Sequence, residues 1–280
     1  MAADSENGKG RGVLQDVNVG WSRLLKGRDG AMLGLISAGI GLHAFNQFAI
    51  VAALPPAAAE IGGTAYFSWA YSLYFMGSIA GGTGAAALRD RFGARASLVF
   101  SALLFAAGGL LALAAPAFSW IMAGRLLQGV ADGLIVAICY SLIPANFPSA
   151  LIARVFAVEA IVWAVAAIAG PLAGGYLTEA FSWRASFLAV APFVLLLPVL
   201  ALAARPRVTE AAPVPLSSAT IALCLAASFV LSLSSVATGG AMQAAAIVAG
   251  AALFLAVLKL DGKIGPKLFP AGAFRLGSVL

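Results

Sequence analysis

Apolar segments long enough to cross a lipid bilayer recur along most of this chain. A helix of about 18 or more apolar residues spans a hydrocarbon core about 30 Å thick. Soluble domains are about 45–50% apolar and about 25% charged, whereas this chain of 280 residues is 62% hydrophobic and 10% charged. We therefore expect an all-α integral membrane protein with the lipid bilayer as its environment.

The polar breaks between the apolar segments predict about eight transmembrane helices. They are expected at residues 31–54, 66–88, 96–115, 119–143, 155–177, 184–204, 217–236 and 241–259. The expected organisation is a tail (1–30) that is either a surface helix or partly disordered, a six-helix unit (31–204), a cytoplasmic linker (205–216), two additional helices (217–259) and a final cytoplasmic segment (260–280).

The basic residues predict the orientation of these helices. All 17 Lys and Arg residues except Arg125 and Arg184 lie in the tail or in connections on one side of the predicted membrane. Positively charged loops stay cytoplasmic, so both termini are expected to be cytoplasmic in a multi-pass plasma (inner) membrane protein. The net charge of +6 follows from this topology, and no nucleic-acid partner is expected.

Helix 4 carries polar side chains where they are costly. Arg125, Gln128 and Asp132 lie along one side of the predicted helix 119–143. A charge at this depth costs at least about 2.5–3.5 kcal/mol, so lipid exposure is excluded and a water-filled cavity is expected. Arg125 is expected to influence the charge state of Asp132.

Helix 1 offers a matching polar face. His43, Asn46 and Gln47 are spaced i, i+3 and i+4. Counting about 1.5 Å per residue along two oppositely directed helices places Asn46 near Arg125 and His43 near Asp132. These residues are the expected substrate and proton pathway, with the alternative that His43 is a neutral histidine hydrogen-bonded within the bundle.

Other polar and small residues have weaker interpretations. Glu159 lies near the predicted cytoplasmic interface and is expected to extend towards it, so it ranks below Asp132 as a functional carboxylate. Glycine and proline concentrate in helices 2 and 5, which indicates either an internal three-helix repeat or close helix packing. These residues are Gly77, Gly81, Gly82, Gly84, Gly170, Pro171, Gly174 and Gly175.

No enzyme chemistry is indicated. The sequence lacks a zinc-protease HExxH motif and a phosphate-binding glycine loop, and it holds a single histidine. Cys139 and Cys224 both lie in apolar runs, where they are expected to be small core residues. We therefore expect no catalytic residue, no metal and no cofactor.

Four motifs together resemble the major facilitator superfamily. They are LRDRFGAR (88–95), GRLLQGVADG (124–133), AGPLAGGYL (169–177) and FSWRASF (181–187). They occur in the order and on the membrane sides that this family shows, and the most similar group is its fourteen-helix drug/proton antiporters. The resemblance implies transport of a small amphipathic molecule, through proton-coupled drug efflux.

The resemblance also implies roles for individual residues. The loop between helices 2 and 3 would latch a cytoplasmic gate through Asp90, Arg91, Gly93 and Arg95, with Gly93 in a positive-φ turn and Asp90 paired with Arg91 or Arg95 or capping helix 3. Arg125 would take part in proton coupling, and Gly170, Pro171, Gly174 and Gly175 would form the antiporter motif.

Two departures from the family pattern matter. This group usually has an acid in helix 1 where the chain has Asn46, which leaves two candidates to carry a proton: Asp132 paired with Arg125, or His43. Helix 8 would also be followed by a second six-helix half. We therefore expect a chain truncated after helix 8 that lacks its carboxy-terminal half. The alternative is a non-transporting remnant, or an interaction subunit that pairs with a separate half.

Overall fold

The computed structural model of the chain describes residues 21–207, 226, 230 and 240–261. These residues form helices and turns, and no β-strand occurs among them. In chain order the elements are α2 (Trp21–Leu24), α3 (Gly27–Ala49), the 3-10 helix η1 (Ile50–Ala52), α4 (Leu54–Ile61), α5 (Phe67–Leu113), α6 (Phe118–Asn146), α7 (Ser149–Ala180), α8 (Trp183–Ser186), α9 (Ala191–Ala204) and α11 (Gly240–Asp261).

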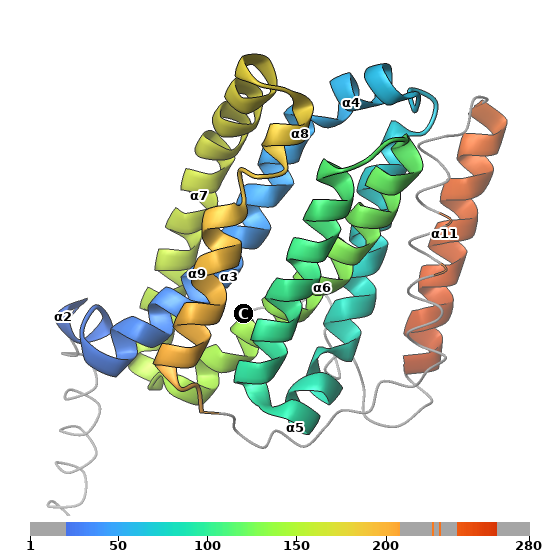
Figure 1. Cartoon of the computed structure of the whole chain (residues 1–280). Helices are drawn as coiled ribbons and strands as arrows, with labels where there is room; N and C mark the ends of the chain where they lie inside the picture. The colour runs from blue at the N-terminus through green and yellow to red at the C-terminus, as the bar shows by residue number, and fades with distance from the viewer. Residues whose placement is uncertain (1–20, 208–225, 227–229, 231–239, 262–280) are drawn as a thin grey trace, which may run out of the picture.

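The first six predicted membrane helices are present. Five segments are long and apolar enough to cross a membrane, and one of them, α5, is two helices joined at Gly93. The long helices run side by side (Figure 1). The all-α membrane bundle is therefore confirmed. The helix predicted at 217–236 falls almost entirely outside the described residues, and the one predicted at 241–259 corresponds to α11.

Two predicted helices are interrupted close to prolines. The helix predicted at 31–54 ends at Ala49 and η1, and α4 then starts with two prolines in its first turn. The helix predicted at 184–204 is divided into α8 and α9, with Pro192 in the first turn of α9. Proline is well tolerated in a first turn, where its missing N–H leaves no bond unmade, so these positions favour the start of a new helix.

Gly93 separates the two halves of α5. Its backbone has φ 79° and ψ 158°, while the surrounding residues are helical. That region is essentially restricted to glycine, so the predicted positive-φ turn is confirmed. The chain reverses at this point, and the second half of α5 returns through the bundle.

We call α3 and the two halves of α5 the first three-helix unit, and α6, α7 and α8 with α9 the second. Glycines bring helices of the two units into close contact. A Cβ at Gly77 or Gly81 in the first half of α5 would overlap the backbone of α6. A Cβ at Gly170 or Gly174 in α7 would overlap α3. The second helix of each unit thus packs against the first helix of the other unit, so close packing and a repeated arrangement explain these glycines together.

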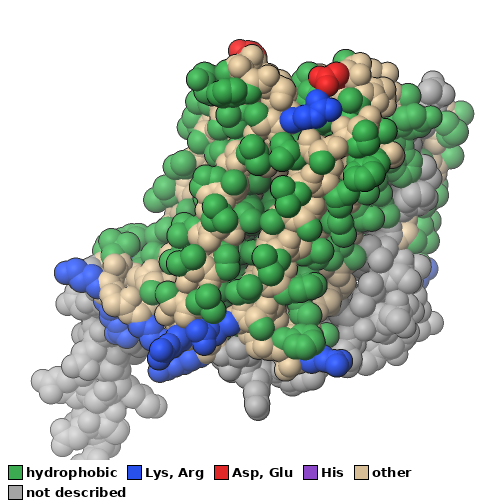
Figure 2. Space-filling view, in the orientation of Figure 1, with side chains coloured by type: hydrophobic (Ala, Val, Ile, Leu, Met, Phe, Trp, Pro, Cys, Tyr) green, Lys and Arg blue, Asp and Glu red, His purple; other side chains and the backbone are tan. Residues whose placement is uncertain are grey.

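The described exterior has the charge distribution of a membrane protein. Figure 2 shows a face whose middle is mainly hydrophobic, with Lys and Arg gathered at its lower end and a few charged side chains at its upper end. The upper end is the one that carries α4 and α8 in Figure 1. Polar side chains that lie deep in the bundle are therefore exceptional and define the candidate site.

Candidate functional site

A histidine and a carboxylate join α3 to α6 inside the bundle. Nδ1 of His43 lies 2.8 Å and 2.9 Å from the two carboxylate oxygens of Asp132. Asp132 is fully buried, and Ser78 of α5 donates a third hydrogen bond to it at 3.2 Å. The ring of Trp163 from α7 packs edge-on against His43. The predicted approach of His43 to Asp132 is thus confirmed.

Arg125 lies two turns from this pair on α6 and is also fully buried. Its Nη1 donates to Gln128 at 2.9 Å and to Asn46 of α3 at 3.4 Å, and its guanidinium carbon lies 3.9 Å from the centroid of the Tyr74 ring. The ring face attracts the cation. The expected pairing of Asp132 with Arg125 is not found, because in the described structure Asp132 contacts His43 and no salt bridge joins it to Arg125.

We call His43, Asn46, Tyr74, Ser78, Arg125, Gln128 and Asp132 the polar seam. Several of its buried atoms have no hydrogen-bond partner among the described residues. They are Asn46 Nδ2, the Tyr74 hydroxyl, Arg125 Nε and Nη2, and Gln128 Nε2. Unpaired buried polar atoms cost free energy, and their concentration here is typical of a site that meets water or a ligand.

Two seam residues and one neighbouring residue were not predicted as site residues. Tyr74 and Ser78 lie one turn apart in the first half of α5, and Trp163 borders the seam from α7. The i, i+4 spacing of Tyr74 and Ser78 beside Gly77 was the available signal. Gln47, which was predicted, is half-buried, and no described hydrogen bond links it to the seam.

Glu159 differs from its prediction. Rather than extending to the interface, it is 2% exposed and accepts a 2.7 Å hydrogen bond from Ser37 of α3. Its second oxygen has no partner among the described residues. The prediction was wrong because it used only the distance along α7 to the charged end. The direction of the side chain depends on how α7 packs against α3.

The loop at Gly93 has the predicted turn but a different ion pair. Asp90 accepts from Arg89 at 3.0 Å, instead of pairing with Arg91 or Arg95. Nη2 of Arg95 donates to the carbonyl oxygen of Leu202 near the end of α9, at 2.8 Å. This bond ties the start of the second half of α5 to the last helix of the six-helix unit.

A second hydrogen-bond network, at the same end of the bundle as the Gly93 loop, was not predicted from the sequence. The Asn146 side chain at the end of α6 accepts from Arg28 at 3.3 Å and from the backbone N–H of Arg207 at 3.0 Å, and it donates to the Arg207 carbonyl oxygen at 3.0 Å. It thereby connects the ends of three chain segments. A single Asn at a helix end carries no signal of such a role.

At the opposite end, Glu60 of α4 is bound by α8. Arg184 donates to it at 2.7 Å and Trp183 at 2.9 Å. These hydrogen bonds, that of Arg184 first, hold the pKa of Glu60 below its usual value. Arg184 also donates to the carbonyl oxygen of Ala115 at 3.2 Å, so this cluster joins three connections of the bundle.

The antiporter motif divides into packed and open positions. Gly170 and Gly174 lie directly against α3, whereas Gly175 has nothing within 4 Å of an added Cβ. Pro171 lies inside α7 and is exposed. In the part of the chain that the structure describes, no group of three or more His, Cys, Asp or Glu residues could hold a metal ion.

Comparisons with known proteins give a family and several relatives for this chain. The family model described as "Major Facilitator Superfamily" matches residues 36–278. A Mycobacterium tuberculosis protein named "Probable multidrug-efflux transporter" is 32% identical over 268 residues, which cover 92% of this chain and 56% of the relative.

Two further relatives carry transporter names. An "Uncharacterized MFS-type transporter" of M. tuberculosis is 29% identical over 86% of this chain and 37% of its own length. The "Acurin A biosynthesis cluster MFS-type transporter" of Aspergillus aculeatus is 30% identical over 56% of the chain and 29% of its own length. The chain spans about half the length of the relative named as a multidrug-efflux transporter and less of the other two. With the family model matching most of its residues, this multi-pass membrane chain belongs to the major facilitator superfamily.

Proposed function

We propose that this chain supplies the amino-terminal helices of a proton-coupled exporter of small amphipathic cations. The polar seam between α3 and α6 is the observation that carries the proposal, and the name of the 32%-identical relative supports multidrug efflux as the activity. The Lys and Arg residues at the Gly93 end of the bundle support a cytoplasmic location for that end and for both termini, in the plasma (inner) membrane.

In this proposal the His43–Asp132 pair holds the transported proton. A carboxylate only accepts hydrogen bonds, and a neutral imidazole can donate one from Nδ1, so the pair satisfies both groups at 2.8 Å. Arrival of one more proton places an additional positive charge in the seam, close to Arg125. Departure of that proton restores a seam whose Arg125 and Asp132 charges balance.

Charge makes the proton and a cationic substrate exclude one another. With Arg125 charged, Asp132 ionised and His43 neutral, the seam is neutral overall, so either a proton or a substrate cation brings it to one net positive charge. Binding both would add a second positive charge inside the bundle, where Coulomb repulsion is stronger than in bulk water. The two ligands therefore compete for the seam, as antiport requires.

The surrounding elements have roles in the same scheme. Alternating access needs one group of helices to rock against another. Arg95 and Asp90 at the Gly93 loop are proposed to latch the cytoplasmic gate. Gly170 and Gly174 of the antiporter motif are proposed to hold α7 against α3 during that motion. The segments 205–216, 217–259 and 260–280 are proposed to act as linker, additional helices and lead-in to further helices.

The test is ethidium efflux from membrane vesicles that contain the natural gene product, under an imposed pH gradient. Asp132→Asn is compared with Glu159→Gln, which makes the same change at a second buried carboxyl. The proposal expects the gradient to drive efflux in wild type and in Glu159→Gln, and to have no effect in Asp132→Asn. Gradient-driven efflux in Asp132→Asn would reject Asp132 as the coupling group.

A further inference from the structure

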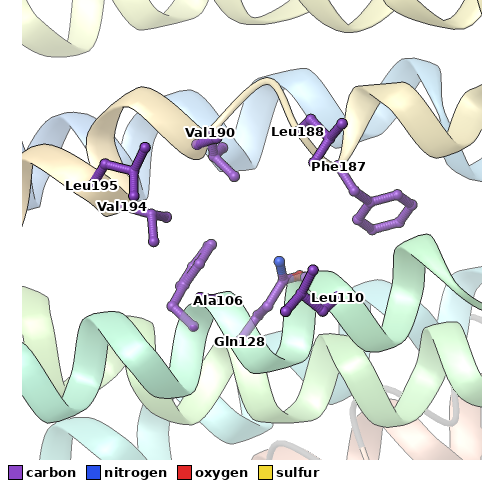
Figure 3. Close-up of a pocket in the computed structure, with 11 residues that line it drawn as sticks. Ala106, Leu110, Gln128, Phe187, Leu188, Val190, Val194 and Leu195 are labelled. Atoms are coloured by element: carbon purple, nitrogen blue, oxygen red, sulfur yellow. The ribbon is translucent and has the colours of Figure 1, made fainter.

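A pocket of about 180 Å³ lies between α5, α6 and α9, beside the Gln128 side chain whose oxygen contacts Arg125. Its walls come from the second half of α5, from the turn after α8 and from the start of α9 (Figure 3). The lining residues are Phe105, Ala106, Gly109, Leu110, Gln128, Phe187, Leu188, Val190, Ala191, Val194 and Leu195. All are apolar or glycine except Gln128.

The pocket opens on the apolar exterior of the bundle. Leu110, Leu188 and Leu195 line it and are 60%, 50% and 70% exposed. All three belong to segments that are long and apolar enough to cross a membrane. A ligand would therefore reach the pocket from the hydrocarbon region of the bilayer.

Gln128 presents its amide NH₂ group, a hydrogen-bond donor, to this apolar space. Its Oε1 accepts from Arg125 at 2.9 Å. A guanidinium can only donate, so the amide oxygen faces Arg125 and the NH₂ group points away from it. Nε2 has no partner among the described residues, although Gln128 is fully buried. In Figure 3 this side chain points into the pocket.

We infer that this pocket binds a neutral apolar molecule of about one aromatic ring that carries one hydrogen-bond acceptor, with the acceptor on Gln128 Nε2. The volume supports the size, because a cavity of about 150 Å³ accepts benzene. A saturated lipid chain lacks an acceptor. Gln128 lies ten residues into α6, about 15 Å from its end, so a lipid ester at the interface would not reach it.

This site shares Gln128 with the seam but is otherwise lined by residues outside it, and it does not depend on the proposed export. It is connected to the seam through one amide, because the same Gln128 side chain accepts from Arg125. A bound acceptor would fix the Gln128 amide and, through it, the position of the Arg125 guanidinium. The ligand is therefore expected to act as an effector of the seam.

The probe for this site is 4-fluoroacetophenone, observed by ¹⁹F NMR with the full chain in lipid nanodiscs. Ala106→Phe fills the pocket from α5. Ala107→Phe is the matched control, since Ala107 is exposed and does not line the pocket. Partition into lipid is the same for both variants, so a difference between them reports the protein site. Wild type and Ala107→Phe should bind saturably, and Ala106→Phe at least tenfold more weakly.

Competition tests the hydrogen bond and keeps the inference falsifiable if Ala106→Phe does not fold. Acetophenone should displace the probe from wild type roughly threefold to tenfold more effectively than α-methylstyrene, which replaces the carbonyl oxygen by a CH₂ group and so lacks the acceptor. Gln128→Leu should remove that preference. Equal competition in wild type would mean unspecific filling by apolar molecules and would overturn the inference, as would undiminished binding to a folded Ala106→Phe.

Discussion

Nδ1 of His43 lies 2.8 Å from a carboxylate oxygen of Asp132, although 89 residues separate the two in sequence. The contact joins the first helix of one three-helix unit to the first helix of the other. It places the single histidine of the chain against a buried carboxyl, and the proposed proton coupling rests on this pair.

His43 is the single histidine of the chain, so an ¹⁵N-histidine label reports on this pair alone. We expect the Nδ1 resonance of the wild type to be that of a strongly hydrogen-bonded N–H. Asp132→Asn should move it towards the position of a weakly bonded imidazole, because a neutral amide oxygen is a poorer acceptor than a carboxylate. Glu159→Gln is the control and should leave it in place. An unchanged resonance in Asp132→Asn would contradict the contact.

Adjacent glycines of α7 should respond in opposite directions to the same substitution. Gly174→Ala places a methyl group into the backbone of α3 and should destabilise the protein by about 1–3 kcal/mol. Gly175→Ala meets open space and should be neutral or stabilising by up to about 1 kcal/mol through helix propensity. Thermal unfolding in detergent micelles measures both. Equal effects would show that α7 does not approach α3 at this position.

Substitution of Gly93 should destabilise the protein because of the backbone conformation at this turn. Gly93→Ala forces a side chain into φ 79° and ψ 158°, which costs about 1–3 kcal/mol. Gly84→Ala is the control, because it lies within the same α5 with nothing within 4 Å of an added Cβ. Unfolding midpoints of the two variants provide the comparison, and a Gly93→Ala variant as stable as Gly84→Ala would argue against the turn.

The contact of Glu60 with Arg184 should persist in mild acid. Hydrogen bonds lower the folded-state pKa of Glu60 below 4.5, so its stabilising contribution is fully present above that pH and is lost as the pH falls through the lowered value. The stability difference between wild type and Glu60→Gln should therefore be constant above pH 4.5 and shrink below it. A difference that grows on acidification would contradict the assignment.

Depth along a helix was the property best predicted from the sequence. Counting residues from the ends of helices 1 and 4 predicted that His43 meets Asp132 and that Asn46 meets Arg125, and both contacts occur. The rise per residue is the same in every helix, so relative depth follows once the helices and their directions are known.

Rotation about the helix axis and contacts between loops could not be predicted in the same way. Glu159 faces Ser37 because of how α7 packs on α3. Asp90 pairs with Arg89 and not with the two other nearby arginines. Such choices depend on packing between segments far apart in sequence. The Gly93 turn was predictable, in contrast, because a local backbone conformation restricts the residue type.

Proton release on substrate binding tests the central claim most directly, because it requires binding but no complete transport cycle. Ethidium is added to purified protein in weakly buffered detergent solution, and a pH-sensitive dye records the protons released for each ethidium bound. We predict release of up to one proton per ethidium from the wild type and from Glu159→Gln, at a pH where the free protein holds the proton, and none from Asp132→Asn. Equal release by Asp132→Asn and wild type would contradict the account.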